Sequence, residues 1–246
     1  MTTDCRPALK ALWKQAFGDP DWFIDAFFDT GYAPERCLYL EEEGSLAAAL
    51  YWMDCDYRGE KLAYLYAVAT GEAFRGRGLC RRLMALAHDT LKVQGYAGCI
   101  LVPGSEGLRQ MYSKMGYADC SRVAEILCKP AAIPAALHRL DIQAYARLRR
   151  EYLPENGVRQ EGDQLNFLDM QTALYAGDGF LAAASVYDGK VHCMELLGDP
   201  NAAPGIVAAL GGEEGFFRMP GTDKPFAMYR PLTGAPAPAY FGLAFD

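Results

Sequence analysis

The stretch that decides the fold is residues 61–91, KLAYLYAVATGEAFRGRGLCRRLMALAHDTL. An apolar strand pattern runs to about Ala69, a loop rich in arginine and glycine follows, and an amphipathic helix begins directly after Gly78. The first turn of a helix leaves about four backbone N–H groups without intrahelical partners, and the helix dipole adds partial positive charge there. Such a junction is a natural site for a phosphate or pyrophosphate group.

The residues of this loop favour an anionic ligand. Gly76 and Gly78 lack the Cβ atoms that would keep a phosphate away from the backbone, and Arg75 and Arg77 add positive charge. A Walker loop is excluded because no Lys followed by Ser or Thr comes after the second glycine. A dinucleotide fingerprint is excluded because Arg81 stands where a third glycine is needed.

The pattern Arg75-Gly76-Arg77-Gly78, framed by this strand and this helix, resembles the Q/R-x-x-G-x-G/A loop of the GCN5-related N-acetyltransferase (GNAT) family. The resemblance implies that the loop binds the pyrophosphate of acetyl-coenzyme A (acetyl-CoA), the co-substrate of that family. It also implies that main-chain groups of the preceding strand pair with the pantetheine and the acetyl carbonyl. The residues that it assigns to coenzyme binding are Val68, Ala69, Thr70, Arg75, Gly76, Arg77, Gly78, Leu79 and Cys80.

The order of the expected elements agrees with that motif. Apolar spacing and turn residues predict two helices, three meandering strands, the helix of the loop, a buried strand, a short helix and a further strand. Their expected ranges are 7–17, 21–31, 37–40, 46–56, 62–69, 79–91, 98–103, 106–115 and 117 onward. The GNAT fold that the motif implies, an α/β fold with a mixed sheet, has this order, and we assign it to residues 1–130 as the catalytic domain.

A second unit is expected after the proline-containing tract at residues 129–134. Residues 134–246 partly repeat the order of the first unit. The expected elements are a helix at 142–152, a hairpin over 180–197 with an Asp-Gly turn, a short helix after Pro200 and strands near 216–219, 226–230 and 240–243. Because this unit lacks an arginine–glycine loop, we expect a degenerate GNAT-like domain. The layout resembles the two-domain enhanced-intracellular-survival acetyltransferases.

Tyr112 is the candidate general acid. The segment 109–117, RQMYSKMGY, resembles a family sequence in which a tyrosine of the helix faces the sulfur of coenzyme A. A phenol with a pKa near ~10 can donate a proton to a thiolate whose thiol has a pKa near ~8.5. The alternative is an aromatic residue that only packs.

The candidate general bases are carboxylates. Asp54 and Asp56 stand at the end of an expected strand, and Glu106 stands in the loop after the second buried strand. The chain-terminal carboxylate of Asp246 is a further candidate. The resemblance favours Asp246, because the two-domain relatives place their chain terminus in the active site. An ordinary surface terminus is the alternative. We expect His88 at the surface or the rim of the site.

The composition narrows the class of function. A net charge of −7 argues against nucleic acid as a partner. No apolar run approaches the length of a membrane span and the N-terminus has no signal-peptide pattern, so the sequence predicts a cytoplasmic protein without a membrane partner. Three histidines and eight scattered cysteines without a CxxC pair predict no metal site. Apolar strand faces could pair in a homo-oligomer.

The sequence therefore predicts an N-acetyltransferase. It would move an acetyl group from acetyl-CoA directly to a primary amine of a small molecule or peptide. Aminoglycosides, polyamines, amino acids and protein amines remain open as acceptors. The alternative is a non-catalytic acyl-CoA-binding module with a regulatory or assembly role.

Overall fold

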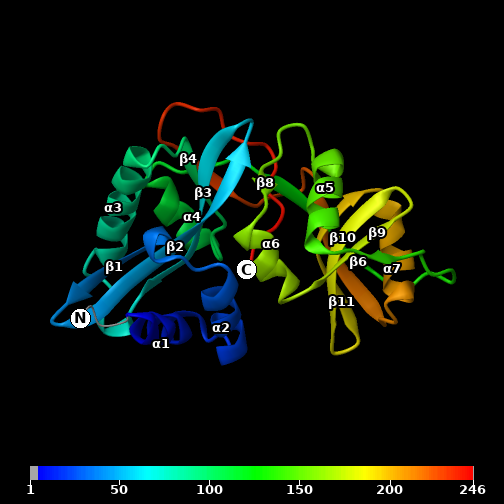
Figure 1. Ribbon diagram of the computed structural model, residues 1–246, viewed down its shortest axis with the longest axis horizontal. Coiled ribbons are helices and arrows are strands. Elements are labelled where there is room, and N and C mark those ends of the chain that lie inside the picture. Colours follow the sequence, from blue (N-terminus) through cyan, green and yellow to red (C-terminus); the bar gives the residue numbers. More distant parts are fainter. Residues whose placement is uncertain (1–4, 246) are drawn as a thin grey trace.

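The computed structural model describes residues 5–245, which form two mixed β-sheets lying side by side with helices packed on their faces (Figure 1). The predicted α/β fold with mixed sheets is confirmed. Among the described residues, no helix is both long and apolar enough to cross a membrane.

The first sheet carries the loop identified in the sequence. Its strand order is β1-β2-β3-β4-β14-β5, with β8 paired to the far end of β2. The strands are β1 (Cys37–Glu42), β2 (Ser45–Tyr57), β3 (Glu60–Thr70), β4 (Gly98–Leu101), β5 (Ala118–Asp119), β8 (Arg159–Gln160) and β14 (Met228–Pro231). The helices on it are α1 (Arg6–Phe17), α2 (Asp21–Thr30), α3 (Leu79–Val93), α4 (Glu106–Ser113) and α6 (Asp163–Asp169).

Both faces of this sheet are buried, and β2 shows how the sequence achieves it. Its side chains alternate between faces, so that Leu50 and Trp52 pack with α3 while Tyr51 and Met53 pack with α1 and α2. A strand covered on both faces reads as a continuous apolar run. The run in β3 has the same origin, because β3 lies between β2 and β4.

The second sheet has the order β13-β6-β12-β11-β10-β9-β7. Its strands are β6 (Arg122–Cys128), β7 (His138–Arg139), β9 (Ala173–Gly177), β10 (Phe180–Tyr187), β11 (Lys190–Gly198), β12 (Glu214–Pro220) and β13 (Lys224–Pro225). One face packs on α5 (Ile142–Tyr152) and the other on α7 (Ala203–Ala209). The expected hairpin is confirmed in register, with Tyr187 opposite Lys190 around the Asp-Gly turn.

The two sheets exchange strands across the expected boundary at residue 130. β6 precedes that boundary and pairs with β12 in the second sheet, whereas β14 lies between β4 and β5 in the first. The two domains expected at residues 1–130 and 134–246 stay a prediction. The two sheets do not separate at that boundary. The expected strand at 240–243 is wrong: this segment is an extended tail that makes a single bridge, between Gly157 and Tyr240.

Candidate active site

The candidate site opens where two parallel strands diverge. β3 pairs with β4 only over Leu62–Tyr64, and then continues to Thr70 with β2 as its strand neighbour. A bulge interrupts the pairing with β2, and Ala67 there has a positive φ of 47°. Among the described strands, none pairs with the other edge of β3 beyond Tyr64. Its backbone N–H and C=O groups are therefore available to a ligand.

The arginine–glycine loop follows at the end of β3. Gly76 and Gly78 have φ angles of 77° and 76°, in the left-handed region that other L-residues rarely adopt. Gly78 is the N-cap of α3, and no side chain of the described residues caps this helix terminus. The first N–H groups of α3 therefore remain free to bind an anion.

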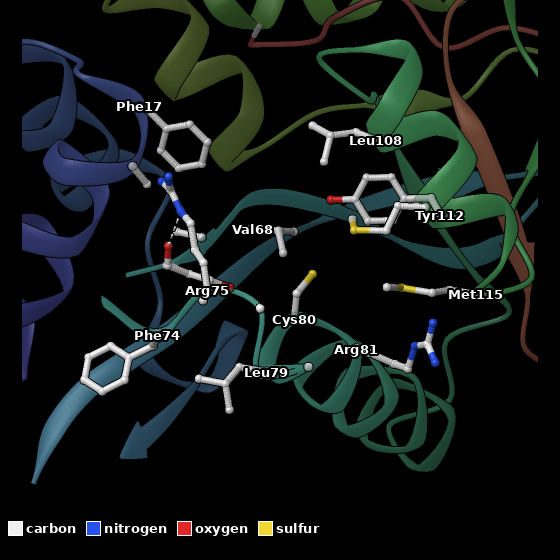
Figure 2. A pocket seen from close by; sticks show the side chains of 16 residues that line it. Phe17, Val68, Phe74, Arg75, Leu79, Cys80, Arg81, Leu108, Tyr112 and Met115 are labelled. Atoms are coloured by element: carbon white, nitrogen blue, oxygen red, sulfur yellow. Dashed lines mark hydrogen bonds between the residues drawn. The ribbon is translucent and has the colours of Figure 1, made fainter. Parts of the chain in front are cut away.

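A cavity of about 560 Å³ lies between this loop, the end of β3 and α4 (Figure 2). It is lined by Tyr112 and by eight of the nine residues assigned to coenzyme binding. These eight are Val68, Ala69, Thr70, Arg75, Gly76, Gly78, Leu79 and Cys80. Arg77 does not line the cavity, because its guanidinium lies 2.9 Å from Oε1 of Glu43 and donates to the carbonyl of Ala73 at 3.2 Å. The roles of all nine residues in coenzyme binding stay predictions.

Two guanidinium groups remain for an anionic ligand. Arg75 and Arg81 line the cavity, and neither forms an ion pair with a carboxylate of residues 5–245. The neighbouring Arg82 differs, since its Nη2 lies 2.7 Å from Oε1 of Glu42. Arginine is well suited to phosphate oxygens, which it binds through paired N–H groups.

Tyr112 lies on the opposite wall of the cavity, on α4. Ser105 caps that helix by accepting a hydrogen bond from the N–H of Leu108 at 3.2 Å. The ring of Tyr112 is buried, and Figure 2 shows its hydroxyl directed into the cavity. No hydrogen-bond partner for this hydroxyl occurs among the described residues. Burial raises the pKa of Tyr112 well above its ordinary value, so it remains a protonated donor.

A second cavity, of about 610 Å³, joins the first. The two share Ala16, Phe17, Val68, Leu108 and Tyr112 as lining residues. Figure 2 shows Phe17 on one side of Val68, with Leu108 and Tyr112 on the other. The geometry therefore provides one compartment with a cationic loop and a second, neighbouring compartment that meets it at Tyr112.

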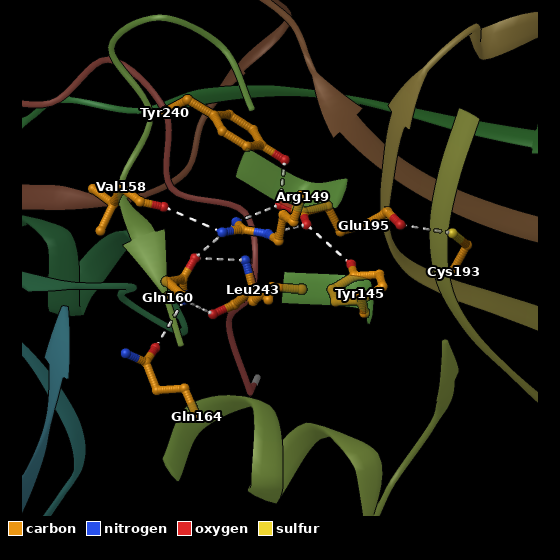
Figure 3. A network of polar contacts seen from close by, with 9 residues as sticks. All are labelled: Tyr145, Arg149, Val158, Gln160, Gln164, Cys193, Glu195, Tyr240 and Leu243. Atoms are coloured by element: carbon orange, nitrogen blue, oxygen red, sulfur yellow. Dashed lines mark hydrogen bonds and ion pairs between the residues drawn. The ribbon is translucent and has the colours of Figure 1, made fainter. Parts of the chain in front are cut away.

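A buried polar network holds the C-terminal tail beside this second cavity (Figure 3). Nε and Nη2 of Arg149 donate to the carboxylate of Glu195 at 2.7 and 2.9 Å, and the hydroxyl of Tyr240 donates to the same carboxylate at 2.9 Å. The side-chain oxygen of Gln160 accepts a hydrogen bond from the N–H of Leu243 at 3.0 Å. The network thus fixes the tail at two points.

The end of the tail reaches the second cavity. Phe245 lines it, is 6% exposed, and its N–H donates to the hydroxyl of Tyr64 at 3.4 Å. Its ring packs against Phe167 with centroids 4.8 Å apart. Asp246, the expected base, lies outside the described residues, and its role stays a prediction.

The other expected bases lie elsewhere. Asp54 pairs with Lys61 at 3.3 Å and accepts a hydrogen bond from the hydroxyl of Tyr96. Asp56 pairs with Arg159, and Glu106, the first residue of α4, is exposed. None of the three lines either cavity.

The expectation for His88 is wrong. The side chain is 7% exposed, and its Nε2 lies 2.9 Å from the hydroxyl of Tyr117. Burial lowers the pKa of His88 to about 4, so the ring is neutral at physiological pH. The apolar positions beside it on α3 face the core, and the sequence pattern did not separate this position from the exposed ones.

The cysteines are free thiols at packing positions. Burial raises the pKa of Cys80, and that of Cys99 to about 12, so neither is a thiolate nucleophile at neutral pH. Among residues 5–245, no group of three or more His, Cys, Asp or Glu side chains is arranged to hold a metal ion.

Sequence reasoning missed several residues of the second cavity. Asp19 follows α1, whereas Gln171 and Met194 come from the second half of the chain. No local pattern marks them, because they reach the cavity only through the packing of distant segments.

Residues 1–120 match the family model described as an acetyltransferase (GNAT) domain. No curated protein matches the sequence. A probable N-acyltransferase of Enterococcus faecalis V583 shares the fold with a TM-score of 0.68 and 17% identity, over 95% of this chain and 72% of that one. A GCN5-related N-acetyltransferase of Kribbella flavida matches with a TM-score of 0.69 and 17% identity, over 95% and 70% of the chains.

Eis1 from Mycobacterium abscessus gives a TM-score of 0.68 at 11% identity, over 94% of this chain and 72% of its own. At such identities the solved structures show the fold, and the family model adds the family of the segment that carries the loop and Tyr112. Residues 1–120 of this chain are therefore a domain of the GNAT acetyltransferase family, and 94–95% of the chain shares its fold with these solved structures.

Proposed function

We propose that this protein transfers an acetyl group from acetyl-CoA directly to a primary amine of a small molecule or peptide. The observation that carries the proposal is the meeting of two cavities at Val68 and Tyr112. The first has free N–H groups and two guanidinium groups for the phosphates of coenzyme A. The second leaves room for an acceptor of about the size of an ordinary small-molecule ligand.

Direct transfer needs a neutral amine, a polarised carbonyl and a protonated leaving group. The acceptor ammonium first loses a proton to the expected base, the carboxylate of Asp246, or to water, and its nitrogen then attacks the thioester carbonyl carbon. The C–N bond forms, the C–S bond breaks, and the nitrogen releases its second proton. Free N–H groups on the open edge of β3 stabilise the developing oxyanion. Tyr112 donates its hydroxyl proton to the sulfur and recovers one from solvent.

Binding of acetyl-CoA is tested by calorimetry on matched arginine variants. Arg75→Ala removes a guanidinium that lines the cavity, whereas Arg77→Ala removes one that pairs with Glu43 outside it. A charge-assisted hydrogen bond contributes about 1.5–3 kcal/mol, so Arg75→Ala should raise the Kd at least about tenfold. Arg77→Ala should change the Kd less than about threefold, as expected of a surface ion pair. Equal effects of the two variants, or no binding by the native protein, would contradict the proposed site.

Catalysis is tested with Tyr112→Phe, which keeps the buried ring and removes a hydroxyl that has no hydrogen-bond partner among residues 5–245. We expect kcat for an accepted amine to fall by about 10²-fold, in the range of general acid catalysis, with the Kd of acetyl-CoA unchanged. Unchanged kcat would make Tyr112 a packing residue. If the native protein binds acetyl-CoA but no amine accelerates its turnover, the non-catalytic acyl-CoA-binding module is the correct reading.

A further inference from the structure

The second cavity has a wall of unusual composition for a site that binds amines. Seven of its lining side chains are aromatic, and most of the remainder are aliphatic. Trp13 and Tyr66 pack with ring centroids 5.4 Å apart, and Tyr66 packs against Phe245 at 5.8 Å. Edge-to-face and tilted contacts of this kind leave ring faces and edges for further apolar contact. The cavity therefore favours a ligand with an aromatic or aliphatic body.

One charged side chain, Asp19, occurs among the described residues that line this cavity. Asp19 follows the left-handed Gly18 that ends α1, so the turn carries it from the helix toward the cavity. Its Oδ2 accepts a hydrogen bond from Nε1 of the buried Trp13 at 2.7 Å, which fixes the position of the carboxylate. Its Oδ1 has no partner among residues 5–245, so this oxygen can accept a hydrogen bond from a ligand.

The charge of the cavity limits the charge of the acceptor. A polyamine or an aminoglycoside carries several ammonium groups, and each loses hydration when it enters an apolar compartment unless a carboxylate or another acceptor pairs with it. The described wall supplies one carboxylate. Asp246, the expected base, follows Phe245 in the sequence, and in that role its carboxylate would serve the reacting ammonium group itself rather than the additional ones. Electron-rich ring faces can add cation–π attraction for a single ammonium group, but they do not replace several carboxylates.

We propose that the acceptor is a primary monoamine with an aromatic or aliphatic body, and that Asp19 binds its ammonium group as it enters the cavity. This inference rests on the proposed acetyl transfer and narrows its acceptor. Asp19 acts in binding and specificity. Phe17, which lines both cavities and is 47% exposed, forms the apolar mouth through which the amine approaches Val68 and Tyr112.

The first test compares acceptors. Initial rates of coenzyme A release are measured with acetyl-CoA and with 2-phenylethylamine, tryptamine, hexylamine, spermidine or kanamycin. We expect kcat/KM to be at least about tenfold higher for each monoamine than for either polycation, since one unpaired ammonium group in such a site costs at least ~1.4 kcal/mol. A higher kcat/KM for spermidine or kanamycin overturns the inference and leaves the proposed acetyl transfer intact.

The second test isolates the charge of Asp19. Asp19→Asn keeps an oxygen that can accept the hydrogen bond from Trp13. We expect it to raise the KM for 2-phenylethylamine about fivefold with little change in kcat, the upper end of the loss typical of a partly exposed charge pair. The inhibition constant of the neutral analogue 2-phenylethanol should be equal in the native protein and the variant. A general disturbance of the cavity would change this constant as well.

The two proposals fail in different ways. Absence of acetyl-CoA binding by the native protein contradicts the proposed function before any acceptor is tried. A second outcome affects Asp19 alone. If the native protein binds and turns over acetyl-CoA normally, and Asp19→Asn has the same KM for 2-phenylethylamine as the native protein, the role of Asp19 is overturned.

Discussion

Replacement of Arg149 by Met should destabilise the protein strongly, because it leaves a buried carboxylate without its cation. The side chains of Arg149 and Glu195 are 3% and 0% exposed, and two N–H···O bonds of 2.7 and 2.9 Å join them. Removal of one partner of such a pair costs about 3–5 kcal/mol. For a chain of this length each kcal/mol lowers Tm by roughly 2–4 °C, so we expect a fall of about 10 °C.

Urea unfolding followed by far-UV circular dichroism measures the loss in the free energy of unfolding, and thermal unfolding measures the fall in Tm. Arg150→Met is the matched control: Arg150 is the next residue on α5, is exposed, and pairs with the half-buried Glu161. We expect that control to cost less than about 1 kcal/mol, as exposed ion pairs do. The double variant Arg149→Met/Glu195→Gln removes the unpaired charge while keeping an acceptor for Tyr240, so it should recover at least about half of the lost stability. If Arg149→Met and Arg150→Met unfold at the same urea concentration, the unpaired carboxylate of Glu195 does not cost the expected free energy of unfolding.

Two further changes test the tail and the core. Gly242→Ala would place a Cβ 1.9 Å from Oε1 of Glu195 and 2.3 Å from the hydroxyl of Tyr240, so the tail should be displaced from its position in the structure. We expect kcat/KM for an accepted amine to fall at least about tenfold. The Kd of acetyl-CoA, measured by calorimetry, should not change. His88 has a pKa of about 4 in the folded protein, below the ~6.5 of the unfolded chain. Between these pH values the unfolded state therefore binds more protons than the folded state. The contribution of His88 to the free energy of unfolding is fully present above about pH 6.5 and is lost as the pH falls toward about 4. Urea unfolding from pH 7 to pH 4 should show a decline about 2 kcal/mol steeper in the native protein than in His88→Gln, which has no titrating ring and can still bond to Tyr117; parallel curves would contradict the assignment.

Local sequence was enough to predict the cationic compartment of the site. The strand, the loop and the helix of residues 61–91 follow one another directly, so their geometry depends on near neighbours. Gly76 and Gly78 take the left-handed conformations that glycine permits, and the start of α3 presents its free N–H groups for the reason that any helix does. Tyr112 was found in the same way, on a short helix with its own cap.

The second cavity depended on contacts between distant segments. A pattern of apolar residues predicts that a strand is buried, but it does not say which strand lies beside it, and so β6 and β14 could not be assigned to their sheets. The divergence of β3 from β4 arises from the same non-local pairing.

The sequence by itself determined the GNAT loop, the helix of Tyr112 and the expected acyl-donor chemistry, because each is written in a short contiguous segment. Only the tertiary structure decided which residues line the second cavity. Asp19 comes from the turn after α1 and Phe245 from a tail held by Arg149 and Glu195, more than 200 residues later in the chain. Their meeting depends on the packing of one sheet against the other, which no local pattern encodes.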